Sequence, residues 1–575
     1  MDEANSRILP TRRSVLRGIG LAACAGVTLA ADSQTPASQS PGVSALHHDR
    51  TFVDLLRSPD QATAYVEEAG AVPLTRSGNA WHGNGIALVC EDKPGELPLT
   101  VTATSPLLRI HLRWKATLPE GLSVLGDAWE RSYGDLGWRG MVPERPMPWY
   151  FLTFDGRSVH AYGVRTGAGA LAFWQCDPEG ISLWLDLRNG GKGVLLGSRT
   201  LSAATVLARQ GHPDESAFAN ARTFCAMMCP QPRLLPQAVY GSNDWYYAYG
   251  DSSATDILRD ASLMAELAPQ SGPRPFTIAD EGWKNVQKFP DMADLAAKIH
   301  SKSVRPGLWV RPLRARGETD TTLLLPSARF GAHSEDAASN RAYDPTIPEA
   351  RDKALEKVRQ AVSWKYELVK HDFTTFDLLG QWGSTMGASP TLPGWSFHDR
   401  SKTNAEIIHQ LYQEIRTAAG EQTIILGCNV IGHLSAGIFE LQRTGDDVSG
   451  RNWERTRRMG VNTLAFRLPQ HRTFFTLDAD CVPFTKDIPW SLTKSWLRAV
   501  ATTGTALLVS PSPDATGAEQ KQAIREAFRI VASPGATARP EDWLLTRTPQ
   551  SWRIGNTESL RYEWLESGGA WPFAI

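Results

Sequence analysis

Between residues 51 and 232 the chain alternates apolar and polar positions in short runs. The runs read LLRIHLRWKATL, YFLTFD, VHAYGVRT, ALAFWQC and ISLWLDLRN, and glycine, proline, asparagine and aspartate separate them. A period of two places every second side chain on the same face of a strand, and the separating residues are typical of turns. The pattern therefore predicts an N-terminal antiparallel β-sandwich domain over 51–232.

After Pro236 the pattern changes to a repeated alternation of strand, loop and helix. Eight apolar runs predict strands, and they read AVYGSNDW, FTIADEGW, RPGLWVRPL, YELVKHDF, TIILGCN, FELQRTGDD, FFTLDADC and TALLVSP. Six further segments carry apolar residues three and four positions apart, which predicts helices. Only the crossovers near 433–439 and 453–464 lack a clear helical pattern. The fold class is therefore α/β, with a (β/α)8 TIM barrel over 236–535 and a short C-terminal β appendage over 540–575.

Polar and aromatic residues stand at the C-terminal ends of the predicted barrel strands. In this fold the catalytic residues come from these ends and from the loops that follow them. The residues are Trp245, Asp280, Glu281, Arg311, Lys370, Asp372, Asn429, Arg443, Asp446, Asp447, Asp478 and Asp480. Charge scattered over a surface would not collect at one end of successive strands, so the sequence predicts an enzyme.

The fourth predicted strand carries two charged residues that are two positions apart. Side chains alternate across a strand, so Lys370 and Asp372 share one face, while His371 points to the other face and is expected to be packed and hydrogen-bonded. A lysine beside an aspartate keeps the carboxylate ionised, as a carboxylate nucleophile requires.

Composition and charge narrow the possible partners and cofactors. Lys and Arg number 60 against 61 Asp and Glu, so no electrostatic argument favours nucleic acid or an anionic membrane surface. Seven cysteines have spacings that suit neither a zinc site nor a dense disulfide framework, and we expect no metal and no cofactor. Cys225 and Cys229 could form a disulfide or remain buried thiols.

The first thirty residues resemble an export signal. Residues 11–17 read TRRSVLR, which resembles the twin-arginine motif, and a weakly apolar stretch over 18–30 follows. We expect a signal peptide over 1–31 and a disordered linker over 32–50, with a periplasmic or secreted mature chain. The stretch is too short and too rich in glycine for a membrane span, and no later segment is apolar for long enough to cross a bilayer.

The residues at the barrel mouth favour glycoside cleavage. The chain lacks metal-ligand spacing, a glycine-rich phosphate loop and a serine nucleophile elbow. Glycoside cleavage needs one carboxylate at the anomeric carbon and one carboxylic acid at the leaving oxygen. Asp372 suits the first role, and Asp446 suits the second because the like charge of Asp447 favours a protonated acid.

Several short motifs resemble those of glycoside hydrolase families 27 and 36, the retaining α-galactosidase-like enzymes or melibiases. The resemblance covers about 239–510, and the N-terminal β-domain resembles the one that family 36 carries. The motifs, in family order, are Gly241-x-Asn243-x-Trp245, Asp280-Glu281-Gly282-Trp283, Lys370-x-Asp372, Cys428, Thr444-Gly445-Asp446 and Asp478-x-Asp480.

The resemblance implies a role for each matching residue. It makes Asp372 the nucleophile and Asp446 the acid/base, with Asp447 as the alternative acid because of its spacing from Arg443. Substrate contacts would come from Trp245 as a pocket wall, from Lys370, Arg443 and Asn429, and from Asp280 with Glu281 at the far hydroxyls of a galactose-like ring. The expected activity is hydrolysis of a terminal α-galactoside in an oligosaccharide or glycoside by double displacement.

Three departures from the family pattern leave the substrate open. The family usually has aspartate where Glu281 stands, residues 429–433 lack the side chains that usually contact the 2-position, and Arg311 stands where family 36 often has glutamate, which an anionic sugar could explain. β-L-Arabinopyranosides and α-N-acetylgalactosaminides share the ring geometry of galactose. A transglycosylase and a non-catalytic carbohydrate-binding protein are further alternatives, and the sequence leaves the oligomeric state open.

Overall fold

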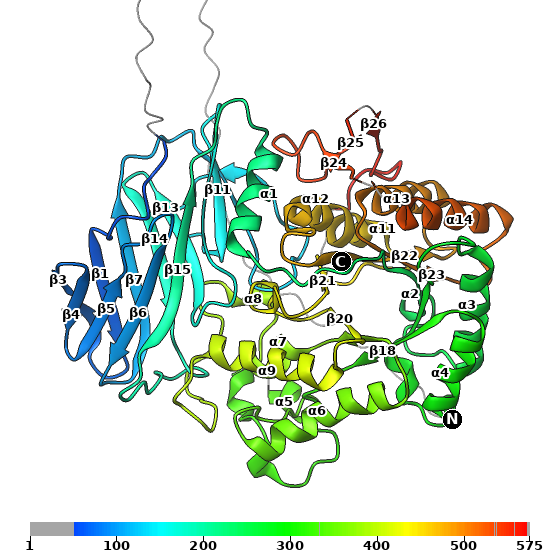
Figure 1. Ribbon diagram of the computed structural model, residues 1–575, viewed down its shortest axis with the longest axis horizontal. Helices are drawn as coiled ribbons and strands as arrows, with labels where there is room; N and C mark the ends of the chain where they lie inside the picture. The colour runs from blue at the N-terminus through cyan, green and yellow to red at the C-terminus, as the bar shows by residue number, and fades with distance from the viewer. Residues whose placement is uncertain (1–50, 333, 534, 536, 557, 572–575) are drawn as a thin grey trace, which may run out of the picture. The chain divides into compact units, whose positions relative to one another are not determined.

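The computed structural model describes residues 51–575 except 333, 534, 536, 557 and 572–575. The expected signal peptide and linker, 1–31 and 32–50, lie outside the described residues. The fold has an N-terminal β-sandwich, a closed parallel barrel and a small C-terminal sheet, which confirms the predicted fold class (Figure 1).

The sandwich consists of two antiparallel sheets. The six-stranded sheet has the order β10 (Met147–Pro148), β13 (Leu171–Asp177), β14 (Gly180–Asp186), β7 (Leu107–Lys115), β1 (Gln61–Val66) and β2 (Gly70–Pro73). The nine-stranded sheet has the order β3 (Thr75–Ser77), β4 (Ala80–Gly83), β5 (Ile86–Cys90), β6 (Leu97–Ala103), β15 (Leu201–Arg209), β12 (Val159–Val164), β11 (Tyr150–Phe154), β8 (Ser123–Gly126) and β9 (Arg139–Gly140).

Strands β1, β5 and β6 bury alternate residues, as the period of two predicts. In β6 every second side chain is buried in the core, from Leu97 to Ala103. Strand β12 is buried on both faces because helix α1 (Ala217–Met228) covers its outer side. A side chain at Gly163 would collide with Phe224 and Met228 of this helix, so the close approach requires glycine there.

Eight parallel strands close the barrel. They are β16 (Tyr240–Asn243), β17 (Phe276–Ala279), β18 (Arg305–Val310), β19 (Leu368–His371), β20 (Ile424–Gly427), β21 (Leu441–Arg443), β22 (Thr476–Phe484) and β23 (Ala506–Pro511), and β23 pairs with β16. All but one of these strands are buried along their whole length, which explains why they are nearly continuous apolar runs in the sequence.

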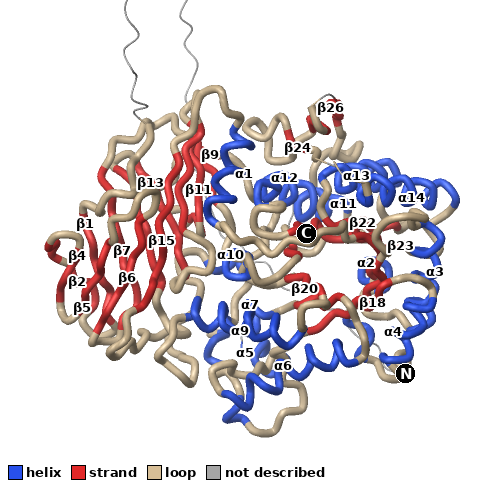
Figure 2. Tube along the Cα trace, in the orientation of Figure 1, coloured by secondary structure: helices blue, strands red, loops and turns tan. Residues whose placement is uncertain are grey.

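Long helices cover the barrel strands in six of the eight crossovers (Figure 2). They are α3 (Ala254–Leu267), α4 (Met292–Ser301), α6 (Pro348–Ser363), α9 (Asn404–Ala419), α13 (Trp490–Thr503) and α14 (Ala518–Ala532). Polar side chains define several of their starts: Ser253 and Thr403 each cap a helix and form a reciprocal capping box with the acidic residue three positions later.

The two crossovers without a clear helical pattern are irregular. The fifth holds only the single turn α10 (Gly432–Ser435), and the sandwich covers the space beside it. His433 stacks on the ring of Trp149 at 4.7 Å and its ring nitrogen lies 2.9 Å from the carbonyl oxygen of Val164. The sixth consists of α11 (Trp453–Thr456), a π-helical segment (Arg457–Asn462) and α12 (Thr463–Arg467).

Short elements in the loops complete the fold. Loops at the barrel mouth carry α2 (Trp245–Ala248), η1 (Glu281–Lys284), η2 (Thr321–Leu323), η3 (Ser327–Phe330), α5 (Ser334–Ser339), α7 (Thr374–Leu379) and α8 (Gly383–Met386), and η5 (Leu468–Gln470) follows α12. The C-terminal sheet has the order β24 (Arg539–Pro540), β25 (Ser551–Ile554) and β26 (Glu558–Arg561). The chain after it packs on the barrel helices, where the indole NH of Trp453 donates to the carbonyl oxygen of Trp564.

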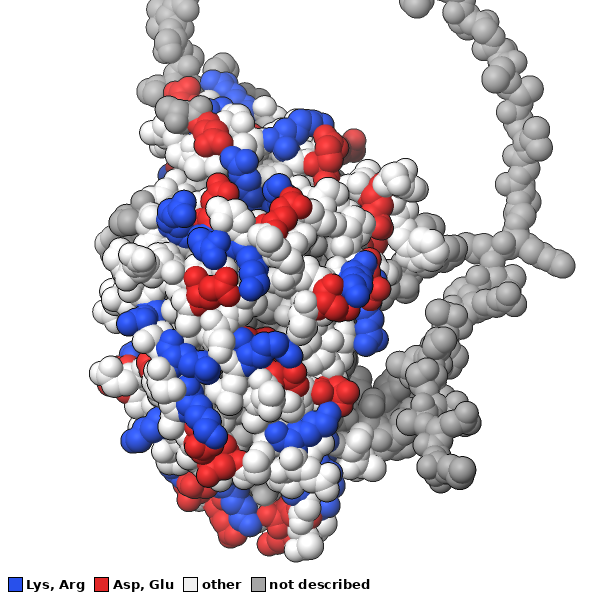
Figure 3. Space-filling view, turned by 90° about the vertical axis from the view of Figure 1, so that its right-hand side faces the viewer, with Lys and Arg blue, Asp and Glu red and all other residues white. Residues whose placement is uncertain are grey.

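Charges of both signs are mixed on the face that Figure 3 presents. Lysine and arginine side chains alternate with aspartate and glutamate, so this face has no broad area of one sign. None of the helices within the described residues is long and apolar enough to cross a membrane.

Candidate active site at the barrel mouth

Two strand ends are joined by a buried ion pair. The ammonium group of Lys370, at the end of β19, lies 2.7 Å from Oδ2 of Asp280, which follows β17. Asn243 donates to the same oxygen at 2.9 Å. Burial opposes the charge of Lys370, but the carboxylate of Asp280 outweighs this and raises the pKa of the ammonium group. The ion pair fixes the floor of the mouth and leaves both groups little exposed.

Asp372 is held by neutral donors. Strand β19 ends at His371, and Phe373 then adopts the left-handed conformation with φ 65°, which turns the chain sharply. The indole NH of Trp309 donates to Oδ2 of Asp372 at 3.0 Å, and the backbone NH of Phe373 donates to Oδ1 at 2.7 Å. The predicted pairing of Lys370 with Asp372 is wrong, because the lysine reaches across the barrel to Asp280 instead.

His371 faces away from the mouth, as predicted. It is fully buried, its Nε2 is hydrogen-bonded to the hydroxyl of Thr374, and its ring packs edge to face with Tyr412 and Phe439. Burial lowers the pKa of its imidazole to about 3, so the ring is neutral.

Asp446 and Asp447 differ in what surrounds them. Two arginines hold Asp446: Arg131 lies 2.7 Å from Oδ1 and Arg455 lies 2.8 Å from Oδ2. Asp447 forms longer ion pairs with Arg131 at 3.4 Å and with Arg443 at 3.2 Å. The side chain of Asp447 is 40% exposed, against 17% for Asp446. The more accessible carboxylate is therefore that of Asp447.

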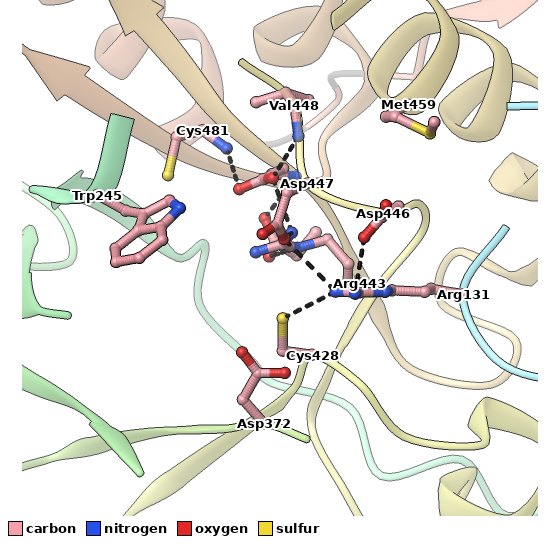
Figure 4. Close-up of polar contacts among 12 residues, drawn as sticks. Arg131, Trp245, Asp372, Cys428, Arg443, Asp446, Asp447, Val448, Met459 and Cys481 are labelled. Atoms are coloured by element: carbon pink, nitrogen blue, oxygen red, sulfur yellow. Dashed lines mark hydrogen bonds and ion pairs between the residues drawn. The ribbon is translucent and has the colours of Figure 1, made fainter. Parts of the chain in front are cut away.

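Figure 4 shows how the carboxylates lie. In this view Asp372, Asp447 and Trp245 lie around one region, with Cys428 near Asp372, whereas Asp446 points toward Arg131. Burial would raise the pKa of Asp447, but the positive charges of Arg131, Arg443 and Lys370 outweigh it and lower that pKa.

Arg443 organises the loop that carries Asp447. Its guanidinium is buried and forms ion pairs with Asp478 at 3.2 Å and with Asp480 at 2.7 Å, in addition to the one with Asp447. Asp480 also accepts a hydrogen bond from the backbone NH of Val448 at 3.0 Å. Through these contacts Asp478 and Asp480 order the loop that carries Asp447.

The other residues that were expected to bind substrate differ in their exposure and in their partners. Glu281 is partly exposed and pairs with Lys284 at 3.0 Å and with Arg314 at 3.4 Å, while Asp280 caps the short helix η1 by accepting from the Glu281 NH. Trp245 is partly buried and begins α2 directly after β16. Asn429 is fully buried, with its amide bound to Glu130 and to the backbone NH of Phe376.

Arg311 forms an ion pair that the sequence pattern does not reveal. Its Nε donates to Oδ2 of Asp377 at 2.9 Å and its terminal nitrogen donates to Asn340 at 2.8 Å. Both side chains of the pair are buried. The charge of Arg311 is therefore balanced within the protein, and the arginine by itself gives no reason to expect an anionic sugar.

A loop of the sandwich, residues 127–136 between β8 and β9, reaches into the barrel mouth and was missed by sequence reasoning. The backbone of Ser132 pairs with the strand-six loop: its NH donates to Thr444 at 3.0 Å, and its carbonyl accepts from Asp446 at 2.8 Å. Arg131 contacts both aspartates, and Glu130 binds Asn429 and the Gly383 NH. The signal that could have found it is a long loop rich in charged and aromatic residues, since such loops are commonly functional.

Burial raises the pKa of the Glu130 carboxyl group and of the cysteine thiols. Burial raises the pKa of Glu130 although Arg131 and the hydrogen bond from Tyr133 oppose this.

Cys225 and Cys229 are free, buried thiols, as are the other four cysteines of the described chain. Within that part of the chain, no three His, Cys, Asp or Glu side chains are grouped to hold a metal ion.

Comparisons with known proteins identify the architecture. No protein-family model and no curated protein sequence matches the chain. Among solved structures, the α-galactosidase TtGalA from Thermus thermophilus has a TM-score of 0.57 at 16% identity, covering 87% of this chain and 99% of that one. The family 36 α-galactosidase AgaA from Geobacillus stearothermophilus has a TM-score of 0.56 at 12% identity, covering 83% and 75%. The galactosidase domain of AgaSK, an α-galactosidase-sucrose kinase, has a TM-score of 0.52 at 12% identity, covering 84% and 71%. The chain therefore has an α-galactosidase-like fold.

Proposed function

We propose that the protein is a retaining glycoside hydrolase that cleaves a terminal α-galactoside. The observation that carries the proposal is that two carboxylates, the largely buried Asp372 and the more exposed Asp447, lie at the C-terminal end of the barrel on the same side as Trp245 (Figure 4). Glycoside hydrolysis with retention requires such a pair. The likeness in fold to α-galactosidases supports the same reaction class.

Asp372 is the nucleophile in this proposal. No lysine or arginine within the described residues forms an ion pair with it, and two neutral donors fix its orientation. A carboxylate held in this way keeps a free lone pair for attack on the anomeric carbon. The attack forms a glycosyl ester with Asp372 and breaks the bond to the leaving oxygen.

Asp447 is the acid/base in this proposal, in preference to Asp446. Asp447 gives a proton to the leaving oxygen and then takes one from the water that cleaves the glycosyl ester. Two arginines at 2.7 and 2.8 Å occupy both oxygens of Asp446, so a proton there would sit between two cations. The greater exposure of Asp447 and its spacing from Arg443 support this choice.

The galactose-like specificity rests on the strand ends beside Asp372. Lys370 and Asp280 on the floor, Trp245 at the side and the partly exposed Glu281 at the rim are the candidate contacts for sugar hydroxyls. Solved structures of TtGalA hold p-nitrophenyl α-D-galactopyranoside and stachyose. These ligands belong to TtGalA, and they indicate which glycosides to test first here.

Trapping with a fluorinated galactoside tests the nucleophile and the sugar together. A slow fluorosugar substrate should label one peptide, the one that contains Asp372, and NMR of the first product from p-nitrophenyl α-galactoside should show the α-anomer. Label on another carboxylate, or release of the β-anomer, would refute the mechanism. Parallel assays with the α-N-acetylgalactosaminide and the β-L-arabinopyranoside decide between the related sugars.

We also propose export by the twin-arginine route. The support is the TRRSVLR segment and the weakly apolar stretch that follows it. Fractionation of cells that express the full chain should find the protein outside the cytoplasm, and replacing Arg12 and Arg13 by lysine should retain it inside. Unchanged export of that variant would contradict the proposal.

A further inference from the structure

A cavity of about 300 Å³ outside the barrel wall carries an excess of positive charge. It lies between β18, the loop after that strand and helix α6, which are neighbours in Figure 1. Trp283, Tyr343 and Trp364 supply aromatic walls. Five cationic side chains line it, and no aspartate or glutamate is among its described lining residues; the five are Lys284, Arg311, Arg314, Arg316 and Lys357.

The carboxylates around the cavity do not balance these charges. Asp377 neutralises Arg311, and the single carboxylate of Glu281 is shared by Lys284 and Arg314. Lys357 donates to the carbonyl oxygens of Pro312, at 2.8 Å, and of Arg314, which carry no formal charge. The remaining cation, Arg316, is exposed and forms no hydrogen bond or ion pair with any described residue.

Burial and the neighbouring cations both disfavour the charged forms of the two lysines in the cavity. Burial, aided by the charges of Lys284, Arg311 and Arg314 and opposed by Asp377, lowers the pKa of Lys357 to about 8. Burial also lowers the pKa of Lys284, with Arg314 and Arg311 acting in the same direction. An anion in the cavity would offset both the lost hydration and the repulsion.

The cavity is close to the candidate nucleophile. The ammonium group of Lys284 lies 4.1 Å from the centre of the Trp309 ring, and the indole NH of Trp309 donates to Asp372. Trp283 lines the cavity and donates to the backbone carbonyl of Trp309 at 2.7 Å. One tryptophan therefore separates the cationic group from the carboxylate that would receive the sugar.

We propose that this cavity binds an oxyanion: a sulfate, phosphate or carboxylate group. Guanidinium groups suit such anions because they donate parallel hydrogen bonds in a planar fork, and Arg314 and Arg316 both have nitrogens to offer. The anion is either free in solution or a substituent of the glycan, in which case the inference rests on the proposed function. This cavity, and not Arg311 alone, is the feature that fits an acidic ligand.

Binding of inorganic sulfate to the full chain tests the site without reference to catalysis. Calorimetric titration at constant ionic strength, with chloride as the reference anion, should show saturable binding to one site. Arg316→Gln should weaken it by about tenfold, the loss expected for a charge-assisted hydrogen bond. Arg316 has no hydrogen-bond or ion-pair partner among the described residues, so the variant should fold normally. The matched control is Arg529→Gln, an exposed arginine on α14 outside the cavity, and it should bind as the wild type does.

A kinetic comparison identifies the source of the anion. If the anion is part of the glycan, an α-galactoside that carries a sulfate or uronate should have a lower KM than its neutral analogue, and Arg316→Gln should remove the difference while leaving the neutral substrate unchanged. If sulfate binds but the substrates do not differ, the site takes a free anion. Absence of saturable sulfate binding, or equal binding by Arg316→Gln, overturns the proposal. An inactive protein that still binds sulfate would refute only the catalytic proposal.

Discussion

Asp372 and Asp447 stand at the ends of two strands of the same barrel, yet neutral donors surround one carboxylate and arginines surround the other. Trp309 and the Phe373 NH hold Asp372, and both come from the barrel itself. Asp447 contacts Arg443 of the barrel and Arg131 of the sandwich. The barrel alone therefore positions the nucleophile, whereas the surroundings of the acid include an arginine from the sandwich domain.

Removing the Asp372 carboxylate, which neutral donors hold, should lower activity more than any other change. Asp372→Asn should lower kcat on p-nitrophenyl α-galactoside by at least about 10³-fold, because the covalent step is lost. With Asp372→Ala, added azide should enter from the vacated face and give the β-glycosyl azide. Circular dichroism checks that both variants fold. Substantial residual hydrolysis by the asparagine variant would place the nucleophile elsewhere.

A second pair of variants distinguishes Asp447 from Asp446 as the acid/base. Asp447→Asn should lower kcat about 10²–10⁴-fold on an oligosaccharide, whose leaving group needs a proton, and less on a nitrophenyl glycoside. Asp446→Asn should act mainly on stability, because it weakens the pairing of Arg131 and Arg455. Thermal unfolding and kinetics of both variants give the comparison. A greater leaving-group dependence for Asp446→Asn would assign the acid to Asp446.

Arg131→Gln tests whether the sandwich adjusts the acid through its charge. Arg131 lowers the pKa of Asp447, so removing its charge should raise that pKa and keep the acid protonated to higher pH. The basic limb of kcat/KM should then move up by about one pH unit. Arg131→Lys keeps the charge but loses the planar fork, and its limb should stay near that of the wild type. If the basic limb lies at the same pH in the wild type, Arg131→Gln and Arg131→Lys, then Arg131 has a structural role only.

A smaller change in stability is expected from disturbing the packing of the 127–136 loop against the barrel. Gly134 has φ 70°, and a side chain there would come within 2.8 Å of the Arg458 backbone. Gly134→Ala should therefore destabilise the protein by about 1–3 kcal/mol and shift the basic limb slightly in the same direction as Arg131→Gln. The control is Gly140→Ala at the end of β9, the strand that follows the loop, because a Cβ atom there would meet no other atom within 4 Å. Equal unfolding midpoints for the two variants would show that the close contact is not important.

Much of the barrel could be predicted because its signals are local. A strand such as β20 or β23 is a short apolar run, and the residue after it lies at the mouth whatever the rest of the chain does. The polar positions at the strand ends were recognisable for that reason. The free state of Cys225 and Cys229 was open in the sequence and is settled only by their separate, buried side chains.

The missed contacts join residues that are distant in sequence. Arg131 and Asp447 are 316 positions apart, and no periodicity links them. Lys370 prefers Asp280, 90 positions away, to the aspartate two positions along, because the barrel brings β17 and β19 to a common floor. The short fifth crossover has a similar cause: the sandwich occupies the space that a helix would cover, as the stacking of His433 on Trp149 shows.

The reach of the 127–136 loop has a consequence for how the chain matures. During synthesis the sandwich emerges first, and Arg131 is then exposed with no carboxylate to meet. Its partners Asp446 and Asp447 follow only after six barrel strands have been made, and Arg467, which holds Asp127 at the base of the loop, emerges later still. A chain synthesised as far as β20 therefore contains the nucleophile and its two donors but neither Asp446 nor Asp447, so the catalytic set is complete only in the last quarter of translation.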